Sequence, residues 1–332
     1  MAKSSNQKLK LMYLAEIFER ETNEEHGLSV DDLRDRLLLR GVKADRKTLY
    51  LDFEDLRTLG YDIIEKKVGR HVFYYLGSRK FELVELKLLV DAVQSSKFIT
   101  EKKTRALIKK LEELTNTYEG GELSRQVIIA GSDKTDNETI FYNVDDIHHA
   151  IRTDKKIKFR YFRWTVEKKK EYRHGGKYYK ISPWALIWDD ENYYMVGYDS
   201  AEKKPKHFRV DKMSNVGLLE ESREGREALG DIDLPDYSRR LFGMYGGELM
   251  VVILEAKNEM AGVFIDRFGR DISLMPKGKD RFTVRVKVEL SDQFISWIAA
   301  LGPDVRIVSP EAAVNKIREM GERLAAAYAK KA

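Results

Sequence analysis

The sequence predicts a multidomain protein of the α+β class, and three observations lead to this prediction. Residues 8–76 contain three short amphipathic helical segments followed by two β-prone runs. Five or six short strands succeed one another between residues 156 and 219, and from residue 248 the elements follow the order β-α-β-β-α-β. We therefore expect a winged helix-turn-helix, a small β-barrel and a split βαβ domain, which suits a 332-residue chain at ~100–200 residues per domain.

The first three helices follow from the spacing of apolar residues and from capping signals. One helix is expected over residues 8–20, and a second begins after Ser29, whose hydroxyl can cap it, and ends at Gly41. The third begins near Asp45 after a short link, so the second and third form a helix-turn-helix. The faces expected to be buried carry Leu11, Leu14, Phe18, Leu33, Leu37, Leu49, Phe53 and Leu56.

Residues 61–76 complete a winged helix, because two β-prone runs meet at the basic tip Val68-Gly69-Arg70. Residues 1–80 contain sixteen basic and fourteen acidic residues, so duplex DNA binding would depend on where individual cations lie. A recognition helix presents its N-terminal residues to the major groove, and a hairpin can reach phosphates or the minor groove. The candidate DNA contacts are therefore Arg46, Lys47, Thr48, Tyr50, Lys66, Lys67 and Arg70.

Two further helices are expected between residues 81 and 118, with Val84 and Leu88 on the apolar face of the first and with the second ending at Gly120-Gly121. Such a pair suits a connector or a dimerisation element. Residues 119–139 are rich in Gly, Ser, Asp, Asn and Thr, which is typical of a domain boundary. The expected domains are 1–78 (winged helix-turn-helix), 79–143 (helical connector), 144–222 (barrel), 223–247 (linker) and 248–332 (C-terminal domain).

The barrel is expected to begin with a short helix from Val144 and a strand over residues 156–163. Alternation along that strand predicts an apolar face inside the barrel and a basic face outside it. The residues expected inside are Ile157, Phe159 and Tyr161, and those expected outside are Lys156, Lys158 and Arg160.

Basic charge is concentrated in the same region. Residues 152–180 contain twelve basic and three acidic residues, a net +9 in a chain whose total is +5, and aromatic residues are interleaved with them. Phosphates meet cations and bases stack on rings in surfaces that bind single-stranded nucleic acid, so this composition indicates such a surface. It fits equally a solvated charged face whose aromatic residues fill the barrel core.

The last block is expected to form a ferredoxin-like βαββαβ domain with one appended helix. A strand over residues 248–254 precedes a helix near 258–268, two strands over 271–288, a helix at 292–300, and a strand at 305–308. The closing helix is expected to dock on the sheet through Val314, Ile317, Leu324 and Tyr328.

Several of these segments resemble known families. Residues 28–59 resemble the winged helix-turn-helix of DeoR-type bacterial regulators, through Leu28-Ser29-Val30, Asp45-Arg46-Lys47-Thr48-Leu49 and Asp52-Phe53-Glu54-Asp55-Leu56. Residues 182–213 resemble a WYL domain, an Sm-like barrel, through Ser182-Pro-Trp-Ala-Leu186, Tyr193-Tyr194-Met195-Val-Gly-Tyr198 and Lys206-His-Phe-Arg-Val-Asp211-Lys-Met213. The terminal block is similar to the WCX-type extension that accompanies this domain.

The resemblance implies a dimeric transcriptional regulator, with a repressor as our expectation, that binds operator DNA and senses a nucleic-acid or nucleotide ligand through its WYL barrel. Some members act in DNA-damage responses or control phage-defence genes. The sequence departs from the pattern at Leu51, Tyr193, Met195, Lys206 and Lys212. The ligand residues that the resemblance implies are Tyr161, Ser182, Tyr194, His207 and Arg209, to which we add Arg163, Lys180 and Trp184 as candidate contacts.

Other classes of function are disfavoured by composition. The chain has no cysteine, its six histidines lack the spacing of a helical metal site, and it contains neither a phosphate-binding G-x-x-x-x-G-K-[ST] loop nor a G-x-S-x-G elbow. We therefore expect no cofactor, no metal and no enzymatic activity. The N-terminal residues and the short apolar runs predict a cytoplasmic protein that does not span a membrane. The alternative function is an accessory nucleic-acid sensor that regulates a partner enzyme.

Overall fold

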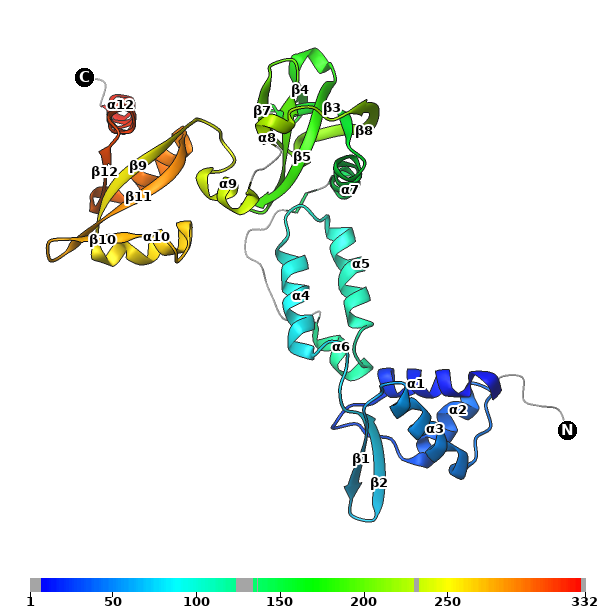
Figure 1. The fold of residues 1–332 in the computed structure, drawn as a ribbon. Helices are drawn as coiled ribbons and strands as arrows, with labels where there is room; N and C mark the ends of the chain where they lie inside the picture. Colours follow the sequence, from blue (N-terminus) through cyan, green and yellow to red (C-terminus); the bar gives the residue numbers. More distant parts are fainter. Residues whose placement is uncertain (1–6, 124–133, 136, 230–232, 330–332) are drawn as a thin grey trace. The chain divides into compact units, whose positions relative to one another are not determined.

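The computed structural model describes residues 7–123, 134–135, 137–229 and 233–329. The helices and strands that the sequence predicted occur in the predicted order, with further short helices between them, and the α+β multidomain class is confirmed. The chain divides into two compact units, residues 1–136 and 137–332, and Figure 1 shows the elements of each.

The first unit opens with a winged helix. After the 3-10 turn Gln7–Leu9 come α1 (Lys10–Glu21), α2 (Val30–Leu39) and α3 (Arg46–Thr58), followed by the antiparallel strands β1 (Ile63–Val68) and β2 (His71–Leu76). Val68 lies opposite His71, so Gly69 and Arg70 form the turn, and Gly69 adopts the positive φ of 62° that a tight hairpin turn requires. Figure 1 shows this hairpin projecting from the helices as a wing.

The core of the winged helix is the one that the apolar spacing predicted. The Ser29 hydroxyl accepts a hydrogen bond from the Asp32 backbone N–H, and the Asp32 carboxylate accepts one from the Ser29 backbone, which is a capping box. Almost no surface remains on Leu14, Phe18, Leu33, Leu37, Leu49, Phe53 or Leu56.

Three helices follow the wing: α4 (Leu83–Ser95), α5 (Glu101–Glu112) and α6 (Thr117–Leu123). Two expectations were wrong here. The side chains of Val84 and Leu88 are 58% and 65% exposed, because Leu86 and Val90 supply the stripe that packs on α5 and α6. Gly120-Gly121 lies inside α6, since α5 already ends at Glu112 and the Asn116 side chain caps a new helix.

The second unit begins with α7 (Thr139–Arg152), which starts before Val144, the residue where we expected it. A curled six-stranded sheet follows, with the order β4-β3-β5-β6-β7 and with β8 paired to β3, and α7 packs on β3, β5 and β8. The strands are β3 (Lys155–Trp164), β4 (Lys170–Tyr172), β5 (Tyr179–Asp189), β6 (Asn192–Asp199), β7 (Lys204–Arg209) and β8 (Met213–Ser222), with 3-10 turns η2 (Arg173–Gly176) and η3 (Val210–Lys212).

Ile157 and Phe159 are fully buried inside the barrel, as predicted. Lys156 was expected on the outer face and is instead 7% exposed. The pairing of β3 with β8 shifts register at this residue, and such a bulge re-aims a side chain. Its ammonium lies 2.6 Å from Glu224 and 3.3 Å from Glu221, which compensates the charge that burial would otherwise disfavour.

The linker contains α8 (Arg226–Leu229) and α9 (Leu234–Arg240). The C-terminal domain then forms an antiparallel sheet of order β10-β11-β9-β12, which is the ferredoxin-like arrangement. Its elements are β9 (Glu248–Lys257), η4 (Asn258–Met260), α10 (Ala261–Phe268), β10 (Leu274–Lys277), β11 (Arg281–Leu290), α11 (Asp292–Ala300), η5 (Gly302–Asp304), β12 (Val305–Ser309) and α12 (Glu311–Tyr328).

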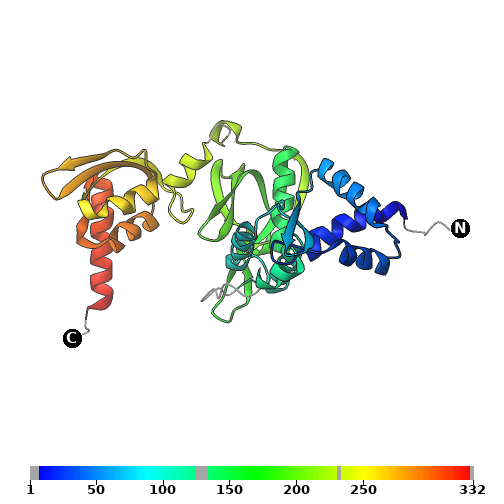
Figure 2. The same ribbon diagram turned by 90° about the horizontal axis from the view of Figure 1, so that it is seen from below.

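The helices of this domain pack on one face of the sheet, around Phe264 and Phe294. Val314 and Ile317 of α12 join this core as expected, but Leu324 and Tyr328 are 53% and 86% exposed, so the predicted stripe is longer than the docked part of the helix. Figure 2 shows α12 lengthwise, with its second half continuing past the sheet. Within the residues that the structure describes, no helix is long and apolar enough to cross a lipid bilayer.

Candidate nucleic-acid interfaces

The candidate DNA contacts of the third helix lie together at its exposed N-terminal end. Arg46, Lys47 and Thr48 occupy the first turn of α3, and all three side chains are exposed. The Thr48 hydroxyl donates to the Asp45 carbonyl, and the Arg46 Nε lies 3.4 Å from the Tyr50 hydroxyl. The edge of the Tyr50 ring meets Phe53 and Tyr74, so Tyr50 also packs on the domain core.

The three wing residues differ in their surroundings. Lys66 donates to the Glu24 carbonyl at 2.9 Å, and Lys67 lies 3.6 Å from the Glu65 carboxylate. Arg70 is exposed in the turn itself. Of the three, Arg70 is therefore the best placed to reach a phosphate beyond the wing.

Three of the candidate ligand residues lie on one outer face of the barrel. Tyr194 on β6 pairs in register with Arg209 on β7, and His207 precedes it on the same face of the strand. The Arg209 guanidinium binds both carboxylate oxygens of Asp211 and donates to Asn192. The Arg209 backbone N–H donates to the Tyr161 hydroxyl, and burial raises the Tyr161 pKa to about 12.

His207 is the most perturbed member of this face. Its Nε2 lies 2.8 Å from the hydroxyl of Tyr237, a residue of α9. Burial lowers the pKa of His207 to about 4, because a charged imidazolium would lose its hydration there. The imidazole is therefore neutral near pH 7 and can accept a hydrogen bond from Tyr237.

Of the other candidate ligand residues, Trp184 packs in one apolar cluster with Tyr194, and Ser182, Arg163 and Lys180 are not part of that cluster. Ser182 is fully buried and its hydroxyl accepts from the Glu224 backbone, while the Trp184 indole donates to the Glu224 carbonyl. Arg163 is exposed and pairs with Glu171, and Lys180 lies 3.5 Å from Glu221. The structure thus brings Tyr161, Tyr194, His207 and Arg209 together, and it places Arg163 and Lys180 apart from them.

A second surface on β3 and its neighbours combines cations with aromatic rings. The Arg160 guanidinium lies 4.9 Å from the ring centroid of Tyr178 and 6.0 Å from that of Tyr172, and Lys158 lies over the Tyr178 ring. Within the described part of the chain, the buried Nε of Arg160 has no hydrogen-bond partner. Arg160 is therefore held by rings and not by a carboxylate.

The same surface continues to the end of β3. Lys170 lies 4.6 Å from the Phe162 ring and 5.9 Å from the Trp164 ring, and Lys212 lies within 5.8 Å of both rings. Trp164 is 52% exposed. We name this surface the aromatic-basic stripe, and it comprises Lys158, Arg160, Trp164, Lys170, Tyr172, Tyr178 and Lys212, with the buried ring of Phe162 beneath them.

Much of the positive charge near the stripe is neutralised by acids that lie later in the chain. Lys155 pairs with Glu220, Lys156 with Glu221 and Glu224, and Lys180 with Glu221. These acids lie outside residues 152–180 and did not enter the count of +9. The field at the barrel surface is therefore set mainly by the stripe and by the basic β3–β4 turn.

The basic and aromatic count over residues 152–180 included every member of the stripe except Lys212, but the candidate ligand residues did not. Arg160, Trp164, Lys170 and Tyr178 were absent from the candidate ligand residues, whereas Arg163 was included. The alternation along β3 could have separated these residues, because residues 158, 160, 162 and 164 lie on one face of the strand and Arg163 lies on the other. Lys212 could not have been placed without the fold.

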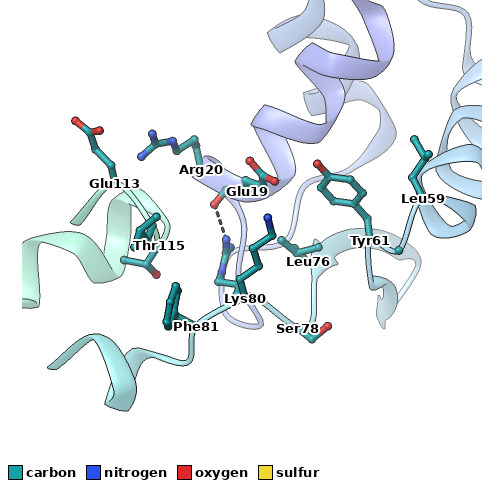
Figure 3. Close-up of a pocket in the computed structure, with 13 residues that line it drawn as sticks. Glu19, Arg20, Leu59, Tyr61, Leu76, Ser78, Lys80, Phe81, Glu113 and Thr115 are labelled. Carbon is teal, nitrogen blue, oxygen red and sulfur yellow. Dashed lines mark hydrogen bonds between the residues drawn. The ribbon is translucent and has the colours of Figure 1, made fainter. Parts of the chain in front are cut away.

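A pocket of about 590 Å³ lies within the first unit and contains none of the candidate residues. Figure 3 shows it between the end of α1, the end of the wing and the residues that follow α5. Its Arg79 already donates to the carbonyls of Glu19 and Thr22, and its lining mixes cations such as Lys80 with acids such as Glu113. This arrangement has no clear preference for an anion. No cluster of potential metal ligands occurs in the described residues.

Comparisons with known proteins agree with this architecture. Two family models match the chain: the WYL domain over residues 142–218 and the WCX domain over residues 248–325. A search of curated protein sequences gave no significant match.

Two of the solved structures that match this chain follow, and both are only weakly similar to it. One is the proteasome accessory factor B/C (PafBC) of Arthrobacter aurescens, with 17% identity over 95% of this chain and a TM-score of 0.28. This chain spans 45% of the length of that protein. The other is a CRISPR Cas-related protein, with 14% identity, 74% of this chain and 71% of the other covered, and a TM-score of 0.37. Residues 142–218 therefore form a WYL domain, and residues 248–325 form a WCX domain.

Proposed function

We propose that this protein is a DNA-binding transcriptional regulator whose WYL barrel responds to a single-stranded nucleic acid. The observation that carries the proposal is the aromatic-basic stripe, in which Arg160 lies against two tyrosine rings and an exposed Trp164 lies beneath two lysines. A strand can place phosphates on such cations and stack bases on such rings, at about 1–3 kcal/mol per stacked base.

Duplex DNA would bind at the winged helix. An exposed first turn of α3 with adjacent basic residues is the usual source of base and phosphate contacts in a helix-turn-helix. Arg46 and Lys47 are in that position, and Arg70 stands at the tip of the wing. The small net charge of this domain makes those few side chains decisive.

The proposed assembly is a homodimer, because two winged helices read two half-sites. The exposed stripe of Phe81, Val84 and Leu88 before and along α4 supports this proposal, since an apolar helix face of this kind favours contact with another chain. Leu88→Glu is expected to convert the dimer to a monomer in light scattering, while Lys110→Glu, at an exposed position of α5, should not. A dimer that persists with Leu88→Glu would remove α4 from the interface.

A selection of genomic DNA fragments by the full chain tests the regulator function. The proposal predicts enrichment of a palindromic duplex, and an added single-stranded oligonucleotide should change the amount bound. Trp164→Ala should abolish the effect of the oligonucleotide and leave duplex binding intact. Trp188→Ala, an exposed tryptophan outside the stripe, is the matched control. Strong single-strand binding without any selected duplex would favour the accessory sensor instead.

A further inference from the structure

The face of the barrel with Tyr194, His207 and Arg209 is covered by the segment that leads to the WCX domain. We name the described part of this segment, residues 223–229 and 233–244, the strap. Its apolar residues share one cluster with residues of β5 and β6. The cluster contains Leu229, Tyr237, Leu241 and Met244 from the strap, and Trp184, Ala185, Ile187, Tyr194, Val196 and Tyr198 from the barrel.

The first part of the strap is held by polar contacts. Glu224 receives the Trp184 indole N–H on its carbonyl and donates its own N–H to Ser182, both at 2.9 Å. Its carboxylate lies 2.6 Å from the buried Lys156. The Arg223 guanidinium lies 4.2 Å from the Trp184 ring centroid and donates to the Pro183 carbonyl.

The middle of the strap depends on few contacts. Tyr237 supplies the hydrogen bond to His207, and α9 contains no fully buried residue. Helices of four and seven residues, such as α8 and α9, are not stable by themselves in water and depend on what they pack against. The strap is thus a segment of low local stability that covers a well-packed barrel.

The far end of the strap is part of the WCX core. The Phe242 ring packs against Phe268, Phe294 and Trp297 of that core. The Arg267 guanidinium lies 4.2 Å from the Phe242 ring and donates to the Leu241 carbonyl. A displacement of the strap at His207 would therefore pull directly on residues packed in the WCX domain.

The covered face is continuous with the aromatic-basic stripe. Asp211 in η3 lies 3.0 Å from Arg209 on one side and 3.2 Å from Lys212 on the other, and Lys212 belongs to the stripe. On this face the strap places an aromatic ring, that of Tyr237, against His207. A nucleobase presents a ring as well, so a nucleotide is suited to the same face.

We propose that the strap is an internal competitor of the nucleic-acid effector: a strand on the stripe extends past η3 onto the face of Tyr194 and Arg209 by displacing the strap. The displaced strap then passes the binding signal to the WCX domain. This proposal rests on the proposed function, since it assumes that the stripe binds a strand. The apparent affinity of a ligand that binds only the open state is its intrinsic affinity multiplied by the fraction of molecules that are open. Loosening the strap should therefore strengthen binding.

Thiol labelling of the full chain tests the strap, because the protein has no cysteine. Ala185→Cys places one thiol beneath the strap, where Ala185 is 6% exposed, and Ala256→Cys places one in the WCX core as a control for unfolding. A single-stranded DNA of about 12 nucleotides should accelerate labelling at position 185 and not at position 256. Tyr237→Phe removes one hydrogen bond and should raise both the labelling rate at position 185 and the affinity for the oligonucleotide by about fivefold.

The outcomes separate the two proposals. Oligonucleotide binding that leaves labelling at position 185 unchanged, or that Tyr237→Phe does not strengthen, would overturn the strap and leave the proposed function standing. Equal labelling rates at positions 185 and 256 would show that the strap opens only when the protein unfolds, and would also overturn it. No binding by any variant would overturn the proposed function and the strap together.

Discussion

Acidification should open the strap, and the burial of His207 sets the size of the effect. The pKa of His207 is lowered from 6.5 to about 4 beneath the strap, and in the open state the exposed imidazole regains its ordinary value. Protonation therefore favours the open state. The stability of the closed state is complete above pH 6.5 and is lost as the pH falls from 6.5 towards 4.

The magnitude follows from the same two values. One pKa unit corresponds to about 1.4 kcal/mol, so opening should become about tenfold easier between pH 7.5 and pH 5.5 and gain at most roughly 3 kcal/mol by pH 4. The Tyr237 hydroxyl, whose pKa is raised by burial, does not titrate in this window. Burial also raises the pKa of Glu289, whose negative charge raises the pKa of Tyr237. A control variant must therefore separate the titration of His207 from that of Glu289.

Labelling of the Ala185→Cys thiol with a dipyridyl disulfide, which reports thiols in acid, measures this opening. Rates are divided by those of an Ala326→Cys protein, whose thiol is exposed on α12, at each pH, which removes the reactivity of the thiol itself, and the Ala256→Cys protein reports unfolding. His207→Gln keeps a hydrogen-bonding side chain that does not titrate, and it should flatten the profile. A normalised rate that is independent of pH, or an equal slope with His207→Gln, would refute the assigned role of His207.

Two further predictions concern the first unit. Arg46→Ala combined with Lys47→Ala should weaken duplex binding at least tenfold and leave single-strand binding unchanged. The slope of log affinity against log salt concentration should fall by the equivalent of about two phosphate contacts. Gel shifts at several salt concentrations measure both quantities, and equal losses of affinity for duplex and single strand would contradict the assignment. Ser29→Ala removes the cap of α2 and should destabilise the winged helix by about 1 kcal/mol, as measured by hydrogen exchange of the Leu33 and Leu37 amides. Ser78→Ala, in the exposed loop after the wing, should have no effect. Identical protection of these amides in both variants would show that the cap is dispensable.

The sequence was most informative where one local pattern determines the structure. The Ser29 cap, the buried stripe through Leu33 and Phe53, and the βαββαβ order depend on neighbours along the chain, and the structure has them as expected. The exposed faces of α4 and α12 show the limit of this reasoning. Val84 and Tyr328 continue apolar stripes, yet both side chains are exposed, because the spacing of apolar residues does not say how far along a helix its partner extends.

The candidate site was less predictable because it depends on contacts between distant residues. Lys156 alternates with apolar residues like an outward lysine, and only the later Glu221 and Glu224 give it a buried partner. Similarly, nothing near His207 in the chain indicates that Tyr237 covers it. The charge count located the barrel correctly but could not separate Arg160, which lies among rings, from Arg163, which is paired with Glu171.

That pair of arginines provides the most direct measurement of the central claim, that the aromatic-basic stripe binds a nucleic-acid strand. Both residues lie on β3, and only Arg160 belongs to the stripe. In a fluorescence anisotropy titration with a labelled single-stranded DNA, Arg160→Ala should weaken binding about tenfold or more, and Arg163→Ala should change it less than about twofold. Equal effects of the two substitutions, or a larger effect of Arg163→Ala, would contradict the account.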